Sequence, residues 1–351
     1  YRVYYSTDGG ATWTPGPRVP RRGPRAFAAR GRLGLRFLRG GVRHVTVCGG
    51  ATTLVADRRF WLLEASRGPE GEDAPLEAPG PTEAPPPAYS PALSTAIAPA
   101  DRITGSNPLC APRCGGGEVF YGEDRANPER SPVHVFRSGD GGRTFTPAYR
   151  FTDVRHIHGV FPDPFERDVV WVTTGDDDEE SAIRRSDDRF RSVDRVVSGG
   201  QQARAVDLVF TDDAIYYGSD TPRERNHLYR LDRRSGRAEV VAAVSGSVFW
   251  GRRTPDGYRV FTTVVERSEV NTDPYAEVWT APPKSEAWRC VYRARKDPFH
   301  DKYFDHGQIR LAGGPGEEGV VWVTPYAVVG DRRSRRVDLA AAWETGGDGT
   351  R

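Results

Sequence analysis

Three things are scarce in this sequence: sulfur-containing residues, lysine and long apolar runs. There is no methionine, and lysine occurs only at Lys284, Lys296 and Lys302. No apolar run reaches the roughly 18 residues that a membrane-spanning helix needs, so we expect no transmembrane helix. No long segment repeats its apolar residues with the helical period of about 3.6, which excludes a mainly helical fold.

An excess of charge of one sign is also missing. The chain carries 50 basic and 48 acidic residues, and no block of one sign suggests nucleic acid or a membrane. We therefore expect no nucleic-acid partner and no membrane surface. The chain begins in an apparent strand at Tyr1, so we expect a processed chain or a fragment. Secretion or a periplasmic location is favoured, although the sequence does not decide it.

The four cysteines are Cys48, Cys110, Cys114 and Cys290. Cys110 and Cys114 lie four residues apart in an expected loop, where they either close a small disulfide or remain thiols. Because there is no second closely spaced pair, a structural zinc site of the usual kind is not expected.

What the sequence has in abundance is strand and turn signals, with 39 glycines and 28 prolines. Four kinds of strand recur in the same order, with a period of roughly 45 residues, which is typical of one four-stranded propeller blade. The first strand of each repeat is expected at 42–48, 107–114, 155–162, 203–210, 246–252 and 305–311. We therefore predict an all-β fold, a β-propeller of six blades closed by its N- and C-terminal strands. Residues 337–343 fit none of these repeats and would give seven blades if they form another.

A short motif supports this prediction. Ser138-x-Asp140-x-Gly142-x-Thr144-Phe145 follows a strand, and the same pattern runs from Ser6 to Trp13. In such a hairpin the carboxylate accepts backbone N–H groups, glycine permits a positive φ, and the aromatic ring packs between sheets. A third copy at Ser186–Asp188 has lost the glycine and the threonine.

This pattern resembles the Asp box, or BNR repeat, of sialidase-like β-propellers. The resemblance implies a propeller with these turns on its outer rim, away from the central cleft. Sialidases also use an arginine triad and an Arg-Ile-Pro motif, and the latter is absent here. Some propeller polysaccharide lyases use channel histidines as base or as metal ligands to act on uronates, and this chain is similar to them in residue type.

We expect one propeller domain over residues 1–351. Residues 66–91 interrupt the repeat and are rich in Pro, Glu and Ala, which indicates a surface insert.

Polar residues on the expected innermost strands point to a site in the channel. His156 and His158 alternate along one such strand, as do Gln202 with Arg204 and His306 with Gln308. Because side chains alternate along a strand, both members of each pair are expected to face the channel.

The histidines are open to three interpretations. They are structural, or they bind a divalent metal together with Gln202 and His306, or they act directly as acid and base. Manganese and zinc suit the imidazoles, and calcium would suit the acidic loop at 176–180. That loop is otherwise a solvated surface or a clamp for sugar hydroxyls.

The predicted catalytic residues are those with acid, base or carboxylate-binding chemistry: His156, His158, Arg204, Asp176, Asp220 and Glu266. The predicted substrate contacts are Arg43, Gln202, Gln308, Asn127, His227 and Trp250. Together they favour a carbohydrate-active enzyme, a glycoside hydrolase or a polysaccharide lyase, that cleaves an acidic oligo- or polysaccharide. Two alternatives remain: a non-catalytic propeller that binds a glycan or a protein partner, and a metalloenzyme of another class, such as an oxygenase or isomerase.

Overall fold

The computed structural model describes residues 2–6, 8–18, 32–37, 42–48, 51–56, 59–64, 92–95, 113–314, 316–331 and 333–345. The expected insert at 66–91 lies outside these residues. Regular structure in the described part is nearly all strand, as predicted. No helix of the described residues is both long and apolar enough to cross a membrane.

Five groups of four sequential antiparallel strands account for most of the fold, and each group is a meander. The first strands of these groups are innermost: β3 (Val42–Cys48), β7 (Arg113–Gly115), β11 (Ile157–Pro162), β15 (Ala205–Phe210) and β19 (Val248–Arg253). The second strands are β4 (Ala51–Ala56), β8 (Glu118–Gly122), β12 (Val170–Thr174), β16 (Ala214–Ser219) and β20 (Arg259–Val265). The third strands are β5 (Arg59–Glu64), β9 (Val133–Ser138), β13 (Ala182–Ser186), β17 (His227–Asp232) and β21 (Tyr275–Ala281). The outer strands are β6 (Ala92–Thr95), β10 (Thr146–Phe151), β14 (Asp194–Ser198), β18 (Ala238–Ala243) and β22 (Arg289–Arg295).

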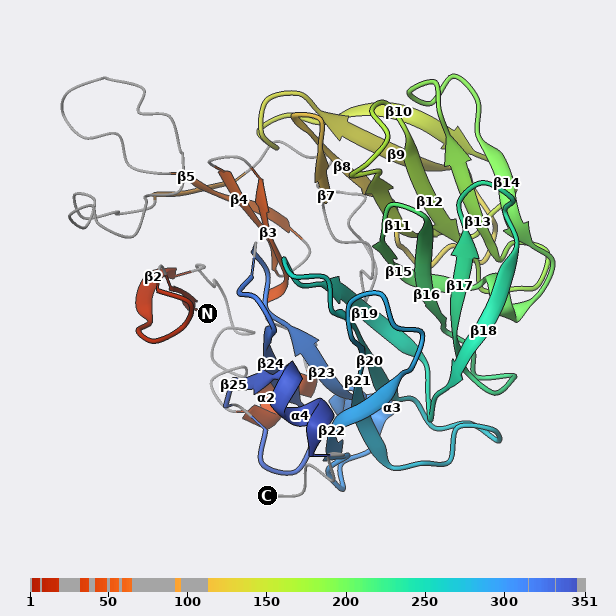
Figure 1. The fold of residues 1–351 in the computed structure, drawn as a ribbon. Coiled ribbons are helices and arrows are strands. Elements are labelled where there is room, and N and C mark those ends of the chain that lie inside the picture. The colour runs from red at the N-terminus through yellow and green to blue at the C-terminus, as the bar shows by residue number, and fades with distance from the viewer. Residues whose placement is uncertain are drawn as a thin grey trace.

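A sixth group contains β23 (Gly307–Leu311), β24 (Val320–Tyr326) and β25 (Arg335–Asp338), followed by helix α4 (Leu339–Glu344). Residues 337–343 are thus the end of a strand and most of a helix, and they start no further sheet. The six first strands surround a common centre (Figure 1), as the repeat predicts. The number of blades in the complete chain stays a prediction.

The C-terminal group, β23 to β25, contacts the neighbouring sheet on each of its two sides and so closes the ring. β23 hydrogen-bonds to β20, with Val264 opposite Gln308. On its other side, a Cβ added to Gly313 would lie 2.5 Å from the Val45 carbonyl oxygen of β3. The backbone of the last group therefore packs directly against the first.

The N-terminal strands do not complete that last sheet as expected. β1 (Arg2–Tyr5) and β2 (Thr14–Arg18) pair only with each other among the described strands. They reach β24 through side chains instead, because Trp322 donates to the carbonyl of Gly9 and stacks edge-on against Trp13 at 5.4 Å.

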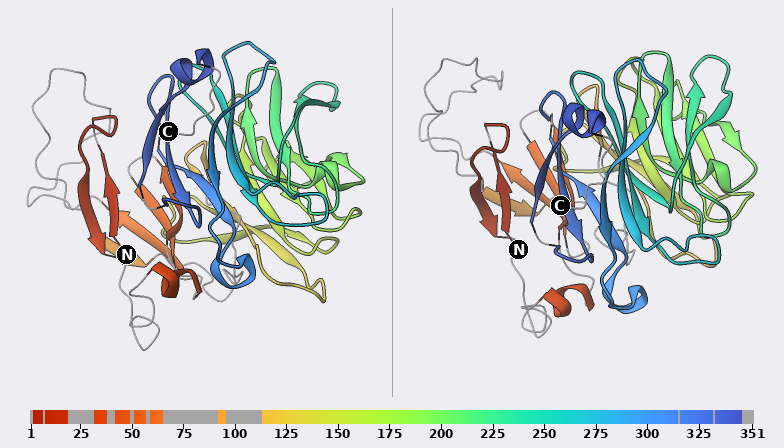
Figure 2. Two further views of the ribbon diagram at one scale, coloured as in Figure 1. Left: turned by 90° about the horizontal axis from the view of Figure 1, so that it is seen from below. Right: turned by 60° about the horizontal axis from the view of Figure 1, so that its bottom comes forward.

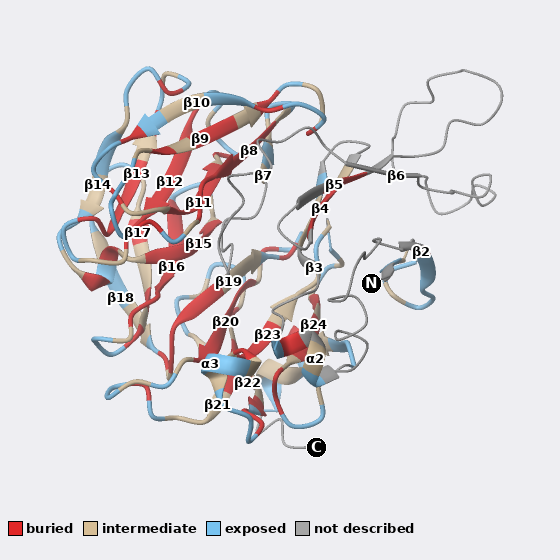
Figure 3. Ribbon diagram, turned by 180° about the vertical axis from the view of Figure 1, so that it is seen from behind, coloured by how far each residue is buried: buried red, intermediate tan, exposed pale blue. Residues whose placement is uncertain are grey.

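The core lies between neighbouring sheets. Every residue of β12, β16 and β20 is buried, whereas β10, β14 and β18 are largely exposed, as Figure 3 shows. The sequence agrees, because β12 and β16 are mostly apolar, whereas the outer strands mix polar with apolar residues.

The Ser-x-Asp turn has the expected hydrogen bonds in all three copies. In the second, Thr144 donates from its backbone N–H and its hydroxyl to Asp140, and Gly142 N–H donates to Ser138. The third copy lacks the glycine and the threonine but keeps the same bonds, because Ser192 stands in the place of the threonine and donates to Asp188.

The glycine position of the third copy is filled by Phe190, at a φ of 71°. Its backbone N–H donates to Ser186, as the glycine does in the other copies. Its ring is buried against Phe120 and Tyr149. Packing of a large ring thus offsets the strain of a left-handed non-glycine residue, which costs about 1–2 kcal/mol.

Cys114 forms a disulfide, and the side chain of its partner lies outside the described residues. The pairing with Cys110 therefore stays a prediction. Cys290 is a free thiol whose burial raises its pKa to about 12, so it is inert as a nucleophile.

Candidate functional site

Two histidines meet at the beginning of β11. His156 lies just before the strand and His158 within it, and their spacing of two residues places both side chains on the same side. Their Nε2 atoms lie 3.0 Å apart. His158 is fully buried and His156 is nearly so.

The opposite nitrogens of the two rings contact backbone carbonyls. His158 Nδ1 lies 3.1 Å from the Ala205 oxygen, and His156 Nδ1 lies 3.4 Å from the Arg125 oxygen. A carbonyl only accepts, so it favours a proton on Nδ1 of each ring. The two Nε2 atoms face each other and Asp176, where they can donate to that carboxylate or, without their protons, coordinate a cation.

Asp176 completes this group from the loop after β12. Its two carboxylate oxygens lie 3.3 Å from His156 Nε2 and 3.6 Å from His158 Nε2. The two imidazoles and the carboxylate could hold a metal ion, and they are the one such group found among the described residues.

The surroundings of this group favour the charged forms of Asp176 and His156. Burial works to raise the pKa of Asp176, but hydrogen bonds from His156 and His158 hold it far below its usual range. Burial works to lower the pKa of His156, yet the contacts with Asp176 and Asp124 raise it above 6.5. The site is therefore built around a negative oxygen and a positive partner.

Arg204 connects this group to the next blade. Its guanidinium lies 2.9 Å from Asp176 and 3.3 Å from Asp220, which follows β16. Arg204 was expected to hold a substrate carboxylate, but here two protein carboxylates already share it. Asp220 is fully buried, and its Oδ1 has no hydrogen-bond partner among the residues that the structure describes.

A second cluster of charge continues around the channel. Burial and the neighbouring Asp220 raise the pKa of Glu266, while His306 and Arg204 oppose that rise. Ser247 donates to Glu266 at 3.4 Å. His306 is a neighbour of this acid and not a member of the metal-capable group, and its Nδ1 makes no hydrogen bond.

The structure corrects the expected position of Gln202. A strand through 202–204 would point its side chain inward, but residues Gln201–Ala203 form a 3-10 turn and Gln202 is exposed. The buried residue is Gln201, which donates to the Asp176 carbonyl at 3.0 Å and to Asp178 at 2.6 Å. The Gly199-Gly200 pair before the turn was the signal that could have revealed it.

Several predicted substrate contacts have structural partners. Asn127 is buried and holds the backbone of its own loop and of Arg155. Gln308 is buried and accepts from Arg310. His227 packs at 6.1 Å from Tyr229, and Trp250 packs on Phe249.

The side chain of Arg43 lies outside the described residues, although its backbone is in β3.

The acidic loop after β12 ties three blades together. Asp177 pairs with Arg130 of the preceding blade at 2.6 Å and with Arg223 of the following blade at 2.7 Å. Glu180 pairs with Arg130 as well. The loop is therefore neutralised by arginines, which argues against the expected calcium site and for a fixed wall beside the histidines.

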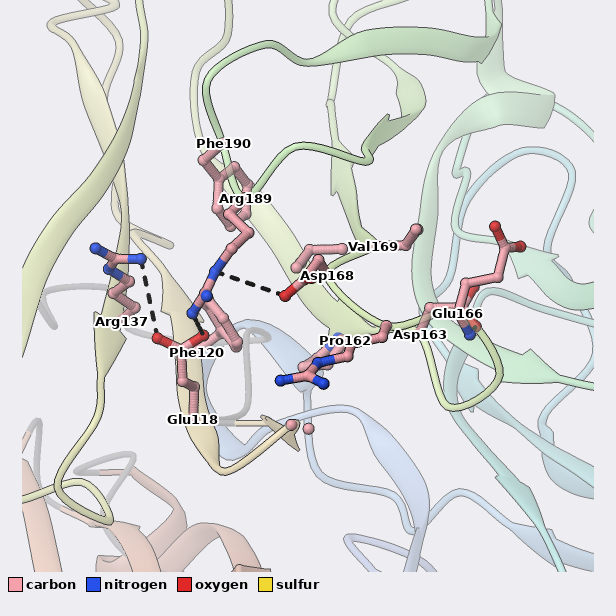
Figure 4. A pocket seen from close by; sticks show the side chains of 14 residues that line it. Glu118, Phe120, Arg137, Pro162, Asp163, Glu166, Asp168, Val169, Arg189 and Phe190 are labelled. Carbon is pink, nitrogen blue, oxygen red and sulfur yellow. Dashed lines mark hydrogen bonds and ion pairs between the residues drawn. The ribbon is translucent and has the colours of Figure 1, made fainter.

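A pocket of about 130 Å³ lies at the opposite end of the sheets, between the β7–β8 and β11–β12 turns (Figure 4). Glu118 crosses it to Arg189 at 2.9 Å, and Arg189 lies 3.7 Å from Asp168. Its charged groups are thus paired with each other, and it contains none of the predicted site residues.

Fold and site together define an all-β propeller with a histidine–aspartate group at one channel mouth. No protein-family model matches the chain, and no curated protein matches it. Among solved structures it is similar to an oligogalacturonate lyase in complex with manganese, with a TM-score of 0.52 and 12% identity over 84% of this chain and 75% of that one. This likeness agrees with the predicted propeller class.

Two further solved structures are similar at lower TM-scores. An oligogalacturonate lyase from Vibrio parahaemolyticus has a TM-score of 0.47 and 9% identity, over 82% of this chain and 74% of that one. The extracellular domain of a hybrid two component system from B. thetaiotaomicron has a TM-score of 0.46 and 9% identity over 82% of this chain. The chain spans 31% of the length of that protein.

Proposed function

We propose that this protein is a metal-dependent carbohydrate-active enzyme that cleaves an acidic glycan by elimination. The observation that carries the proposal is the convergence of the two Nε2 atoms and the Asp176 carboxylate. Imidazole nitrogens and one carboxylate suit manganese or zinc, whereas calcium prefers a site made of oxygen ligands. The carbonyls of Ala205 and Arg125 would fix the ring tautomers, as outer partners of metal-bound histidines do.

Elimination fits the distribution of charge better than hydrolysis does. Hydrolysis needs two carboxyl groups that flank the bond, one of them a proton donor and the other a base or nucleophile. Here Asp176 belongs to the histidine group, and Asp220 is engaged by Arg204. A lyase needs less: a neutralised substrate carboxylate, a base for the adjacent C–H and an acid for the leaving oxygen. A bound divalent ion would supply the first by drawing charge from the uronate carboxylate.

The other two roles would fall to the second cluster. His306 is a suitable base, because its side chain is partly exposed and Asp301, 3.9 Å from the buried Nδ1, would favour a proton there and leave Nε2 to accept one. Glu266 is a suitable acid, because burial and Asp220 favour its protonated form. The base takes the proton next to the carboxylate, the carbon–oxygen bond at the neighbouring carbon breaks, and Glu266 protonates the leaving oxygen. The products are an unsaturated uronate and a new chain end. The manganese-bound lyase of similar fold supports this substrate class.

Metal titration tests the site directly. We expect wild type to bind about one Mn²⁺ or Zn²⁺ per chain in calorimetry, and His158→Ala and Asp176→Ala to bind more than about 100-fold more weakly. His227→Gln is the matched control, because it alters a histidine at the same end of the sheets but outside the group. Failure of wild type to bind either ion at millimolar concentration would refute the metal site.

Activity on polygalacturonate tests the chemistry. We expect a rise in ultraviolet absorbance from the new double bond, abolished by EDTA and restored by the metal. Glu266→Gln should lower kcat by about 10²-fold or more with metal binding unchanged. New reducing ends without absorbance would indicate a hydrolase instead, and metal binding without any cleavage would favour a binding propeller.

A further inference from the structure

We infer that the surface around helix α3 (Asp301–Phe304) is a second sugar-binding subsite, which holds the acidic glycan beyond the bond that is cleaved. This inference rests on the proposed function and names where the rest of the substrate lies. We call the exposed side chains of Phe299, His300, Lys302 and Tyr303 the α3 rim.

The α3 rim presents aromatic rings to solvent. Tyr303 is 50% exposed and Phe299 is 36% exposed, although both are large and apolar. The His300 ring lies 5.8 Å from that of Tyr303, and the Lys302 ammonium lies over the Tyr303 ring at 5.7 Å. Faces of this kind stack on the apolar side of a sugar ring, and the Lys302 ammonium suits a carboxylate of a uronate chain.

Chain connectivity places the α3 rim beside the channel. Helix α3 lies in the connection from β22 to β23, and β23 is an innermost strand. Asp305 ends the helix with a φ of 71°, which turns the chain directly into His306. Asp301 of the helix lies 3.9 Å from His306 Nδ1. A glycan that reaches the proposed base would therefore continue across the rim.

The rim is held rigid from beneath. Arg36 of α2 (Arg32–Phe37) is fully buried, pairs with Asp297 and donates to the Phe304 carbonyl. Its guanidinium lies 5.7 Å from the Phe299 ring, and Phe304 packs at 5.4 Å from that ring. Figure 2 shows α2 and α3 side by side at one end of the sheets.

This support makes a sugar the best occupant. A surface already fixed by a buried ion pair loses little conformational freedom on binding, so stacking contributes fully to affinity. The face is also mixed in character, with the Lys302 ammonium over the Tyr303 ring, and the chain turns from it directly into His306. A uronate chain alternates apolar ring faces with carboxylates in the same way.

Chain-length dependence tests the inference. We expect Tyr303→Ala to raise KM about tenfold or more for galacturonate hexamers, while KM for the dimer and kcat for both stay unchanged. Migration of the same variants through a gel containing polygalacturonate gives a readout that needs no turnover, and Tyr303→Ala should be retarded less than wild type. Phe165→Ala is the matched control, because Phe165 is 47% exposed but lies in the β11–β12 turn at the opposite end.

The outcomes separate the two proposals. Wild type that neither binds nor cleaves any acidic glycan refutes the proposed function. Wild type that does both, with Tyr303→Ala indistinguishable from Phe165→Ala at every length, overturns the subsite alone. Equal losses on the galacturonate dimer and hexamer also overturn it. So does a wild-type protein that is dimeric in solution and becomes monomeric in Tyr303→Ala, because the rim would then be a contact between copies of the chain.

Discussion

At the scale of single residues, the charged side chains at the channel mouth form a continuous row in which each contacts the next. Asp176 contacts both histidines and Arg204, and Arg204 in turn contacts Asp220. Glu266 has no ion pair among the described residues, and His306 and Arg204 only oppose the rise of its pKa. A buried carboxyl in that position is expected to hold its proton at higher pH than usual.

The pH dependence of stability reports on Glu266. A pKa raised on folding contributes stability that is complete below the unfolded value, near 4.3, and is lost as pH rises through the folded value. Glu266→Gln removes that loss. We therefore expect the free energy of unfolding of the variant, minus that of wild type, to increase from pH 4 to pH 7. Urea denaturation measures this difference. Glu239→Gln, at an exposed site, should show no such trend, and a pH-independent difference for Glu266→Gln would contradict the assigned burial.

At the scale of elements, the Ser-x-Asp turn shows which parts of a motif are physically required. The third copy dispenses with glycine and threonine, yet its carboxylate still accepts the Ser192 N–H and hydroxyl. The features common to the three copies are a carboxylate acceptor, two donors four residues on and two consecutive residues of positive φ between them. In the third copy these two residues are Arg189 and Phe190, and the buried ring of Phe190 offsets part of the strain.

Acid titration of this turn has a definite direction. The backbone N–H and hydroxyl of Ser192 lower the pKa of Asp188 to about 2. A lowered carboxyl pKa contributes stability above the unfolded value, near 3.9, and that stability is lost as pH falls through the folded value. Asp188→Asn should therefore be less stable than wild type at pH 6, and the gap in melting temperature should close between about pH 4 and pH 2. The exposed neighbour Asp187→Asn is the control; if its gap also closes with acid, the turn is not the cause.

At the scale of the whole molecule, the ring depends on close backbone contacts between its first and last sheets. Gly313 lies against the carbonyl of Val45, where even a methyl group meets the backbone oxygen. The sheet of β23–β25 also hydrogen-bonds to β20, so the C-terminal group is fixed on both sides. A closed ring removes the sheet edges that would otherwise pair with other chains.

A single methyl group tests that closure. Gly313→Ala should lower the free energy of unfolding by about 1–3 kcal/mol, because the backbone must shift to admit the Cβ. Gly139→Ala is the matched control: nothing lies within 4 Å of its Cβ, and its φ is not positive. It should be neutral or raise stability by up to about 1 kcal/mol. Equal effects of the two changes in urea denaturation would show that the ring is not closed at Gly313.

The sequence predicted the order and class of the strands well, because two local patterns carry that information. Period-two and continuous apolar runs mark strands, and glycine-rich turns separate them. The repeat of about 45 residues then identified which strand of each sheet lies innermost. It also selected His156, His158 and Asp176 as candidates, and the structure brings these three together.

Alternation along a strand misplaced Gln202, because residues 201–203 form a 3-10 turn before the strand begins. Repeat position also grouped His306 with the other histidines, although it lies beside Glu266.

The sequence by itself thus determined the elements, their order and the inner strands, since these follow from interactions between residues near in the chain. Only the tertiary structure decided which polar groups share one point in space, since that depends on turns and on contacts between blades. A strand can be recognised from its own residues, whereas a metal-capable group exists only once loops from separate sheets have packed around the same axis.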